Sequence, residues 1–177
     1  EDRRDPGHAQ AEADCLELAR AAGLTFVDSH VHVFAGVPCL ITERYDRTVA
    51  ANGAVGRVHQ EDLCQAVGVD GASNRGRTKY QRRAGGGPGL REAAILLHTY
   101  AEDTAEALGR LVSAVAFTVA IGNADAHAKN LSFLHDTATT IRLAPLYDTV
   151  PTVLWPNLTD EAAMSINGRF PLGQLTL

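Results

Sequence analysis

The sequence has little cysteine, no long apolar run and no surplus of basic residues. Its three cysteines, Cys15, Cys39 and Cys64, are far apart and form no CxxC pair, which argues against a disulfide framework or a zinc knuckle and favours a reducing, cytoplasmic location. The N-terminus is polar and lacks the apolar core of a signal peptide, and no apolar run could span a bilayer. The net charge of -5 argues against a dedicated nucleic-acid binder. We therefore expect no membrane association and no autonomous DNA binding.

The 177 residues that are present have a globular balance, with 45% hydrophobic and 21% charged residues. Helical periodicity predicts a first helix from about Gln10 to Gly23, where glycine is typical of a helix end. Its expected apolar stripe comprises Cys15, Leu16, Ala19 and Ala22. Polar and apolar residues alternate over 25–34 and again over 40–45, which predicts a β-hairpin connected through the segment AGVP.

Further along the chain, helices and strands do not alternate regularly. The Gly- and Arg-rich stretch 70–89 is expected to be a loop. The other expected elements are a short helix within 59–68, a long helix over 102–120, a hairpin of 131–136 with 140–145, and a strand over 162–166 that ends in the turn Asn167-Gly168. The buried face of the long helix should carry Leu108, Leu111, Val112, Val115 and Val119. This order predicts an α+β fold rather than a doubly wound parallel sheet.

A polar loop, GNADAHAKN (122–130), has the spacing that phosphoryl transfer requires. A kinase needs a carboxylate at the attacking hydroxyl, an amide oxygen for magnesium on the same loop, and a second metal-binding carboxylate from another segment. Asp125 and Asn130 stand five positions apart, as do the Asp and Asn of the protein-kinase catalytic loop. Asp148 follows 23 positions after Asp125, beyond the predicted hairpin that would return the chain to the cleft. Taken alone, the Asp, His and Asn of this loop would be interpreted as ordinary turn-forming residues. Because Asp148 follows at a suitable distance, a magnesium site is the better interpretation.

Two other motifs permit different functions. The segment DSHVH (28–32) resembles the metal-binding start of amidohydrolases, with His30 and His32 on one strand face. That fold is a barrel of about 250 residues, so an outward polar strand face is favoured and a metallohydrolase stays a distant alternative. The basic run Arg75, Arg77, Lys79, Arg82 and Arg83 is interpreted as a solvated loop, or as a contact with an acidic partner.

Several motifs in a fixed order resemble HipA-family serine/threonine kinases, the toxins of type II toxin–antitoxin pairs. GNADAHAKNLSFL followed by LAPLYD is similar to the family's D-x-H-x-K-N loop and its YD metal motif. ITERYDR (41–47) resembles the family hinge, and VHQEDLCQAVGV (58–69) resembles HQEDLCQALG. KYQRRAGGGPG (79–89), AAMSINGRF (162–170) and the helix AEADCLELARAAGL (11–24) also resemble family segments. The resemblance covers about residues 11–170 and is more specific than any one motif.

The resemblance implies a protein-kinase-like α+β fold of HipA type, with a mostly helical C-lobe and a remnant N-lobe hairpin. Residues 1–45 would be the end of the N-lobe with the hinge, and 46–177 a C-lobe that is incomplete at its C-terminus. Asp125 would be the catalytic aspartate, and His127 would support its loop. Asn130 and Asp148 would bind Mg²⁺, and Lys129 would either reach the γ-phosphate of ATP or remain a solvated lysine. Glu43 and Tyr45 would meet the adenine.

The implied function is transfer of the ATP γ-phosphate to serine or threonine of a protein such as an aminoacyl-tRNA synthetase. A HipB-like antitoxin would be the partner and would supply any contact with DNA. Before the hinge the chain has no lysine and no glycine-rich loop, both of which kinases use on the phosphates. We therefore expect a truncated kinase whose isolated activity is absent, and an inert remnant or a nucleotide-binding module is the alternative. Glu12, in the helix 11–24, would be either the partner of the missing lysine or a plain surface glutamate.

Overall fold

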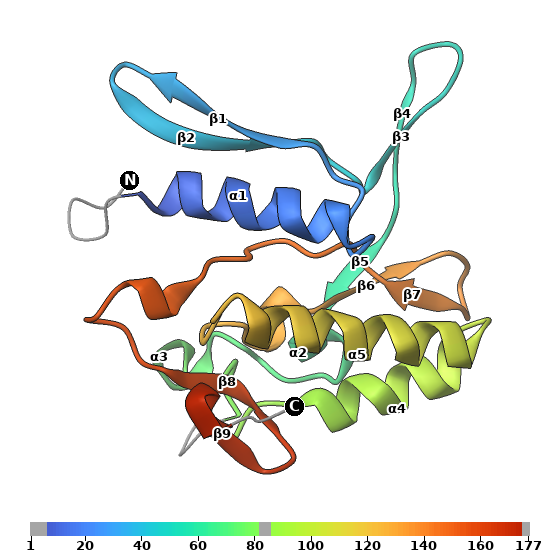
Figure 1. The fold of residues 1–177 in the computed structure, drawn as a ribbon. Coiled ribbons are helices and arrows are strands. Elements are labelled where there is room, and N and C mark those ends of the chain that lie inside the picture. Colours follow the sequence, from blue (N-terminus) through green and yellow to red (C-terminus); the bar gives the residue numbers. More distant parts are fainter. Residues whose placement is uncertain (1–6, 82–85, 175–177) are drawn as a thin grey trace.

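A computed structural model describes residues 7–81 and 86–174 of the chain. Arg82 and Arg83 of the basic run therefore lie outside the described residues. The helices and strands form two parts, which Figure 1 shows one above the other. The first part carries α1 with the hairpins β1–β2 and β3–β4, and the second carries the remaining elements.

The first part is built around α1 (His8–Ala21), on which the hairpin of β1 (Ser29–Phe34) and β2 (Val37–Thr42) packs. Helix α1 buries Cys15, Leu16 and Ala19 as expected, whereas Ala22 is exposed because the helix ends before it. Phe34 pairs with Val37, so the hairpin turn is the dipeptide 35–36 rather than the four residues AGVP. Both turn residues have positive φ, at 48° and 81°, as the tight turns of β-hairpins require.

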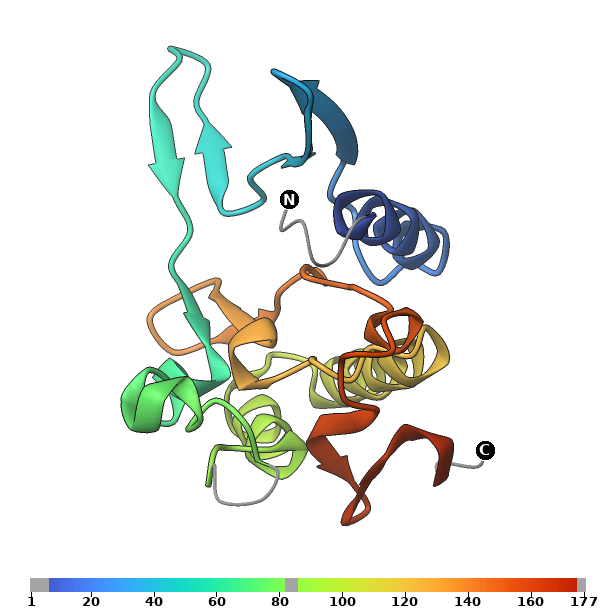
Figure 2. The ribbon, with the colours of Figure 1, turned by 90° about the vertical axis from the view of Figure 1, so that its left-hand side faces the viewer.

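A second hairpin, β3 (Arg47–Val49) with β4 (Val55–Arg57), was not expected from the sequence. It projects from the molecule on the same side as β1–β2 (Figures 1 and 2). Five of its six strand residues are exposed, so no alternation of buried and exposed positions marks it in the sequence. The lobe boundary expected at residue 45 stays a prediction.

The second part consists mainly of two antiparallel sheets and two long helices. The sheet β5–β6–β7 is antiparallel, and β8 pairs with β9 through the expected turn Asn167-Gly168. The elements are β5 (Gln60–Asp62), α2 (Leu63–Ala66), α3 (Ser73–Gly76), α4 (Leu90–Tyr100), α5 (Thr104–Ala120), η2 (Ala128–Asn130), β6 (Ser132–His135), β7 (Ile141–Leu143), η3 (Thr152–Leu154), β8 (Glu161–Ile166), β9 (Arg169–Pro171) and η4 (Leu172–Gln174). Helix α4 was not expected.

The core of this part lies where α2, α4 and α5 meet the β5–β6–β7 sheet. Leu63, Leu97, Leu111 and Phe133 are buried there, and burial of such side chains stabilises the fold by about 1.5–3 kcal/mol each. On α5 the buried residues are Ala107, Leu111 and Ala114. Val112, expected on this face, is 68% exposed, because the contact stripe of α5 follows its small alanines instead.

The expected mostly helical C-lobe is not confirmed, since 36% of the described residues are helical and 23% are in strands. The α+β class is correct. Within residues 7–81 and 86–174, no helix has the length and apolarity to cross a membrane. The segment after β7 runs between α1 and α5 (Figures 1 and 2), and its Leu146 amide donates a hydrogen bond to the carbonyl of Leu24, three residues after the end of α1. This segment brings Asp148 beside α1.

Candidate functional site

The loop 121–130 begins at the C-terminus of α5, and a glycine makes the turn. Gly122 has φ 71°, and its amide bonds to the Val119 carbonyl while the Asn123 amide bonds to the Thr118 carbonyl. These bonds satisfy the last carbonyls of the helix and reverse the chain. A Cβ at position 122 would also collide with the side chain of Val153. The sequence therefore ends α5 sharply and starts the loop in a fixed direction.

Asn123 is buried and holds the loop to the segment that carries Asp148. Its Oδ1 accepts a hydrogen bond from the Asp125 amide at 3.0 Å, and its Nδ2 donates to the Asp148 carbonyl at 3.3 Å. The buried hydroxyl of Thr152 adds a second link, because it accepts from the Ala124 amide at 2.7 Å and donates to the Gly122 carbonyl at 3.3 Å. The loop is thus fixed by residues 25 and 28 positions further along the chain.

Asp125 lies at the edge of a cavity of about 470 Å³. Its Oδ1 accepts a hydrogen bond from the hydroxyl of Tyr80 at 2.9 Å, and its backbone carbonyl accepts one from the His127 amide at 2.7 Å. The carboxylate is partly exposed to the cavity. A carboxylate that is oriented from one side and open on the other can receive a proton from a bound hydroxyl.

Asn130 and Asp148 line the same cavity and contact each other. The side-chain amide of Asn130 donates to Oδ2 of Asp148 at 2.8 Å. Asp148 has φ 53°, a left-handed conformation that is uncommon for a residue with a side chain and that Asp and Asn adopt more readily than most. Such strained residues concentrate at functional sites. The structure therefore brings Asp125, Asn130 and Asp148 together, as their spacing predicted.

Helix α1 closes the cavity with His8 and Glu12. Burial and the neighbouring charge of Asp148 raise the pKa of Glu12 to about 7, against a smaller lowering from the backbone amide of Asp148. The interpretation of Glu12 as a plain surface glutamate is wrong, because the side chain is half-buried and lies beside Asp148. The spacing of residues in the sequence gave no reason to place Glu12 beside Asp148.

These residues fit a magnesium ion. Three carboxylates, of Glu12, Asp125 and Asp148, line one cavity, and no lysine or arginine is among its described lining residues. Oxygen donors of this kind are what Mg²⁺ prefers. The Asn130 Nδ2 also donates to the Asp125 carbonyl at 3.4 Å. A half-turn of the side-chain amide would give up both of its hydrogen bonds and present Oδ1 to an ion between Asn130 and Asp148.

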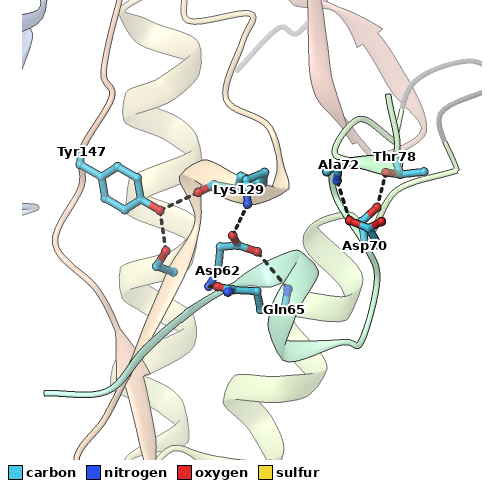
Figure 3. A network of polar contacts seen from close by, with 8 residues as sticks. Asp62, Gln65, Asp70, Ala72, Thr78, Lys129 and Tyr147 are labelled. Atoms are coloured by element: carbon cyan, nitrogen blue, oxygen red, sulfur yellow. Dashed lines mark hydrogen bonds and ion pairs between the residues drawn. The ribbon is translucent and has the colours of Figure 1, made fainter. Parts of the chain in front are cut away.

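Lys129 points away from this cavity and pairs with Asp62. Its Nζ lies 2.6 Å from Asp62 Oδ2 (Figure 3), and this hydrogen bond raises the pKa of Lys129. Asp62 is also the N-cap of α2, where Oδ1 accepts from the Gln65 amide and the Gln65 side chain accepts from the Asp62 amide. Asp62 is therefore both the last residue of β5 and the cap of the helix that follows it.

Tyr147 fixes the backbone on the other side of Lys129. Its hydroxyl donates to the Lys129 carbonyl at 2.7 Å (Figure 3) and contacts the Ser132 hydroxyl. Burial raises the pKa of this phenol well above its usual range, so Tyr147 is a neutral donor. Lys129, near the end of the loop, is therefore held by its side chain through Asp62 and by its backbone carbonyl through Tyr147.

His127 is buried beneath the loop with its ring edge against Tyr80, at 5.3 Å between ring centroids. Burial lowers the pKa of His127, with Lys79 adding to this effect and Asp125 opposing it. Its Nδ1 has no hydrogen-bond partner among the described residues. The role expected for His127, support of the loop, stays a prediction.

Glu43 and Tyr45 do not line the cavity of Asp125. They border a separate hollow of about 200 Å³ with Phe26 and Val27. The Glu43 amide donates to the Asp28 carbonyl, its side chain is exposed, and burial raises the pKa of Tyr45. Their expected role at the adenine stays a prediction.

The segment DSHVH forms part of the outer hairpin. His30 and His32 are exposed on β1, and among the described residues the structure brings no third metal-binding side chain to them. Within that part of the chain, three such side chains meet at His59, Glu61 and His135.

Sequence reasoning did not assign site roles to Asn123, Tyr80 and Thr152. The Asn-x-Asp order of 123–125 was a usable signal, because asparagine commonly bonds the amide two residues on. Tyr80 and Thr152 form hydrogen bonds with loop residues that are 45 and 28 positions away in the chain. No local sequence pattern predicts such contacts.

Comparison with known proteins agrees with this geometry. The profile of the HipA-like C-terminal domain matches residues 3–172. The candidate kinase Y4mE of Sinorhizobium fredii is 40% identical over 172 residues, which are 97% of this chain and 39% of that protein. The serine/threonine-protein kinase toxin HipA of Shewanella oneidensis is 27% identical over 164 residues, 88% of this chain and 36% of that protein. The chain thus spans about two fifths of the length of these relatives.

Solved structures give the same result. The Shewanella oneidensis HipA chain, solved with HipB and operator DNA, superposes with a TM-score of 0.84 at 25% identity over 96% of this chain and 41% of that one. The Helicobacter pylori proinflammatory kinase CtkA superposes with a TM-score of 0.61 at 11% identity over 93% of this chain and 63% of that one, which supports the fold alone. The fold is kinase-like. Within that class, the chain belongs to the family of HipA-like C-terminal domains.

Proposed function

We propose that this chain carries the catalytic and magnesium-binding residues of a HipA-type serine/threonine kinase. The observation that carries the proposal is the cavity that Asp125, Asn130 and Asp148 share. Asn123 and Thr152 fix the loop of Asp125 and Asn130 to the segment that carries Asp148. Phosphoryl transfer asks the protein mainly for positioning and for stabilisation of charge. A rigid loop that presents one open carboxylate beside a metal-binding pair meets both needs.

Each residue has a distinct part in the proposed reaction. Asp125, oriented by Tyr80, accepts the proton of the attacking serine or threonine hydroxyl. Asn130 and Asp148 would hold Mg²⁺, which when bound supplies charge neutralisation at the ATP phosphates. His127 supports the loop. Glu43 and Tyr45 would meet the adenine from the hinge. Lys129 keeps the loop attached to α2 through Asp62, and a contact with the γ-phosphate would require that pair to open.

The biological setting is proposed from the relatives. A HipB-like antitoxin would bind the full-length protein and would carry the contact with DNA, since the Shewanella HipA was solved with both. The substrate would be a protein, for which an aminoacyl-tRNA synthetase is the candidate. The cytoplasmic location follows the expectation from three unpaired cysteines.

A nucleotide-binding module without catalysis is the second candidate. It is favoured by one observation, that Lys129 is paired with Asp62 outside the cavity and that no lysine or arginine is among the described residues lining it. Phosphates in this cavity would then be held by magnesium alone, which removes most of the positioning that the rate depends on.

Phosphate transfer from radiolabelled ATP separates the two candidates. The 177-residue chain should be tested alone and joined to the N-terminal half of a HipA-family relative. We expect no transfer by the chain alone and phosphorylated serine or threonine with the joined protein. In the joined protein Asp125→Asn and Asp148→Asn should each lower the rate by at least about 10²-fold.

Asp136→Asn is the matched control, because Asp136 is exposed and its carboxylate pairs with Arg142 of β7, outside the cavity of Asp125. It should retain full activity. A joined protein that binds Mg-ATP but transfers no phosphate would favour the binding module. Activity that survives Asp125→Asn would refute the role of Asp125.

A further inference from the structure

A cluster of two histidines and one glutamate lies on the β5–β6 ladder, outside the cavity of Asp125. The backbone amide of His135 donates to the His59 carbonyl at 2.9 Å, which places the two histidines opposite each other across the strands. Glu61 is two residues after His59 and therefore on the same face. The pairing of Gln60 with Leu134 thus continues by one residue to His59 and His135. The side chains of His59, Glu61 and His135 therefore lie on one face of the two strands.

The potential ligand atoms are already close to one another. His135 Nε2 lies 3.0 Å from one carboxylate oxygen of Glu61, and His59 Nε2 lies 3.7 Å from the other. The two imidazole centroids are 4.6 Å apart. In a tetrahedral zinc site with bonds of about 2.0–2.1 Å, neighbouring ligand atoms stand roughly 3.3 Å apart. The observed distances bracket that value, so small side-chain rotations would be enough to enclose an ion.

We propose that His59, Glu61 and His135 form a binding site for a divalent cation of the zinc class. Two imidazoles and one carboxylate are typical ligands of Zn²⁺ and are poor ligands for Mg²⁺, which prefers oxygen. The His59 side chain is 66% exposed, and those of Glu61 and His135 are 32% and 24% exposed. The ion can therefore enter from solvent, and water can fill the fourth position.

The position of this site gives it a structural consequence. Glu61 directly precedes Asp62, which holds Lys129, and β6 begins two residues after Asn130. An ion bound by Glu61 and His135 would join the two strands that flank the Lys129–Asp62 pair. Occupancy should therefore stabilise the base of the loop 121–130, whether or not the chain is a kinase.

Metal content of the purified chain tests the proposal. The protein, free of any polyhistidine tag, is stripped with a chelator and dialysed against micromolar Zn²⁺ with excess Mg²⁺ present to occupy oxygen-rich sites. Elemental analysis should find about one zinc per chain. Thermal unfolding should show a higher melting temperature for the zinc-loaded chain than for the stripped chain. His59→Gln, Glu61→Gln and His135→Gln should each weaken zinc binding by at least about tenfold.

The double variant His30→Gln/His32→Gln is the matched control, because it removes two exposed imidazoles from strand β1. It should bind zinc as the unaltered chain does. Cobalt added to the stripped chain should give visible ligand-field bands that His59→Gln abolishes, and His59 is exposed enough for its replacement to leave the fold intact. Absence of bound zinc, or zinc binding by the His59→Gln and His135→Gln variants as tight as that of the unaltered chain, overturns the proposal.

Discussion

The Lys129 ammonium lies 2.6 Å from a carboxylate oxygen of Asp62, a residue 67 positions earlier in the chain. Asp62 is almost completely buried at its side chain, with 10% exposure, whereas Lys129 is 45% exposed. The pair therefore joins the loop of Asp125 to the start of α2 at the edge of the core. It also withholds the lysine of that loop from the cavity.

The strength of this pair can be measured with a double-mutant cycle. Lys129→Met and Asp62→Asn remove the charges, and asparagine keeps the N-cap of α2. We expect a coupling of about 1 kcal/mol in the free energy of unfolding by urea, more than for exposed pairs because Asp62 is buried. The pair Arg142–Asp136, with both side chains 46% exposed, is the control and should couple near zero. Additive effects of the two substitutions at 129 and 62 would contradict the prediction.

Asn123→Ala should disrupt the site without touching a reacting group. The variant loses one hydrogen bond to the Asp125 amide and one to the Asp148 carbonyl in a buried setting, which should cost about 1–3 kcal/mol of stability. Magnesium-dependent nucleotide binding should weaken as well. Asn52→Ala is the matched control, because Asn52 makes a similar bond to the Ala54 amide in an exposed turn. Equal losses in the two variants would show that Asn123 has no special role.

Two glycines of the α5 region should respond to alanine with opposite signs. Gly122→Ala places a Cβ against Val153 at φ 71°, so we expect a loss of more than about 1 kcal/mol. Gly109→Ala, in the open middle of α5 with no atom near the added Cβ, should raise stability by about 0.5–1 kcal/mol. Thermal unfolding of both variants checks this, and a stabilising Gly122→Ala would refute the packing described at the end of α5.

Asp46→Asn should change how stability depends on pH. Arg44 donates hydrogen bonds to Asp46, and with Arg47 it lowers the pKa of that carboxyl to about 2, with burial opposing the change. A lowered pKa means that the stabilisation is complete above the unfolded pKa of about 3.9 and is lost as the pH falls through about 2. The difference in stability between the two proteins should therefore be full at pH 7 and shrink between pH 4 and pH 2. Urea unfolding at each pH measures it, and a constant difference would contradict the prediction.

Local signals in the sequence predicted several of the helices, strands and turns. The hairpins at 29–42 and 132–143, helix α5 and the turn Asn167-Gly168 all have a periodic pattern or a turn signal. Helix α4 was missed although its two buried residues, Ala93 and Leu97, lie one turn apart on one face, and Ile95 of the same helix is 48% exposed. The pairing of β3 with β4 leaves almost no residue buried, so periodicity could not reveal it.

The candidate site divides in the same way. Asp125, Asn130 and Asp148 could be brought together from spacing, because one short loop and one hairpin separate them. The partner of Lys129 could not be predicted, since Asp62 stands 67 positions earlier and helices α2 to α5 lie between the two residues. Likewise, Glu12 reaches Asp148 only through the packing of α1 over the segment after β7, a relationship that depends on the finished tertiary structure.

The contacts of the loop with Asp148 and Thr152 also set an order of events during synthesis. Asn123 and Ala124 leave the ribosome 25 and 28 residues before the groups that fix them. Chains emerge from their N-terminus, and contacts between distant residues form only after the later residue is available. Asp125 therefore reaches its final position only when the segment beyond β7 has been made, so a nascent chain that stops before Thr152 holds no assembled site.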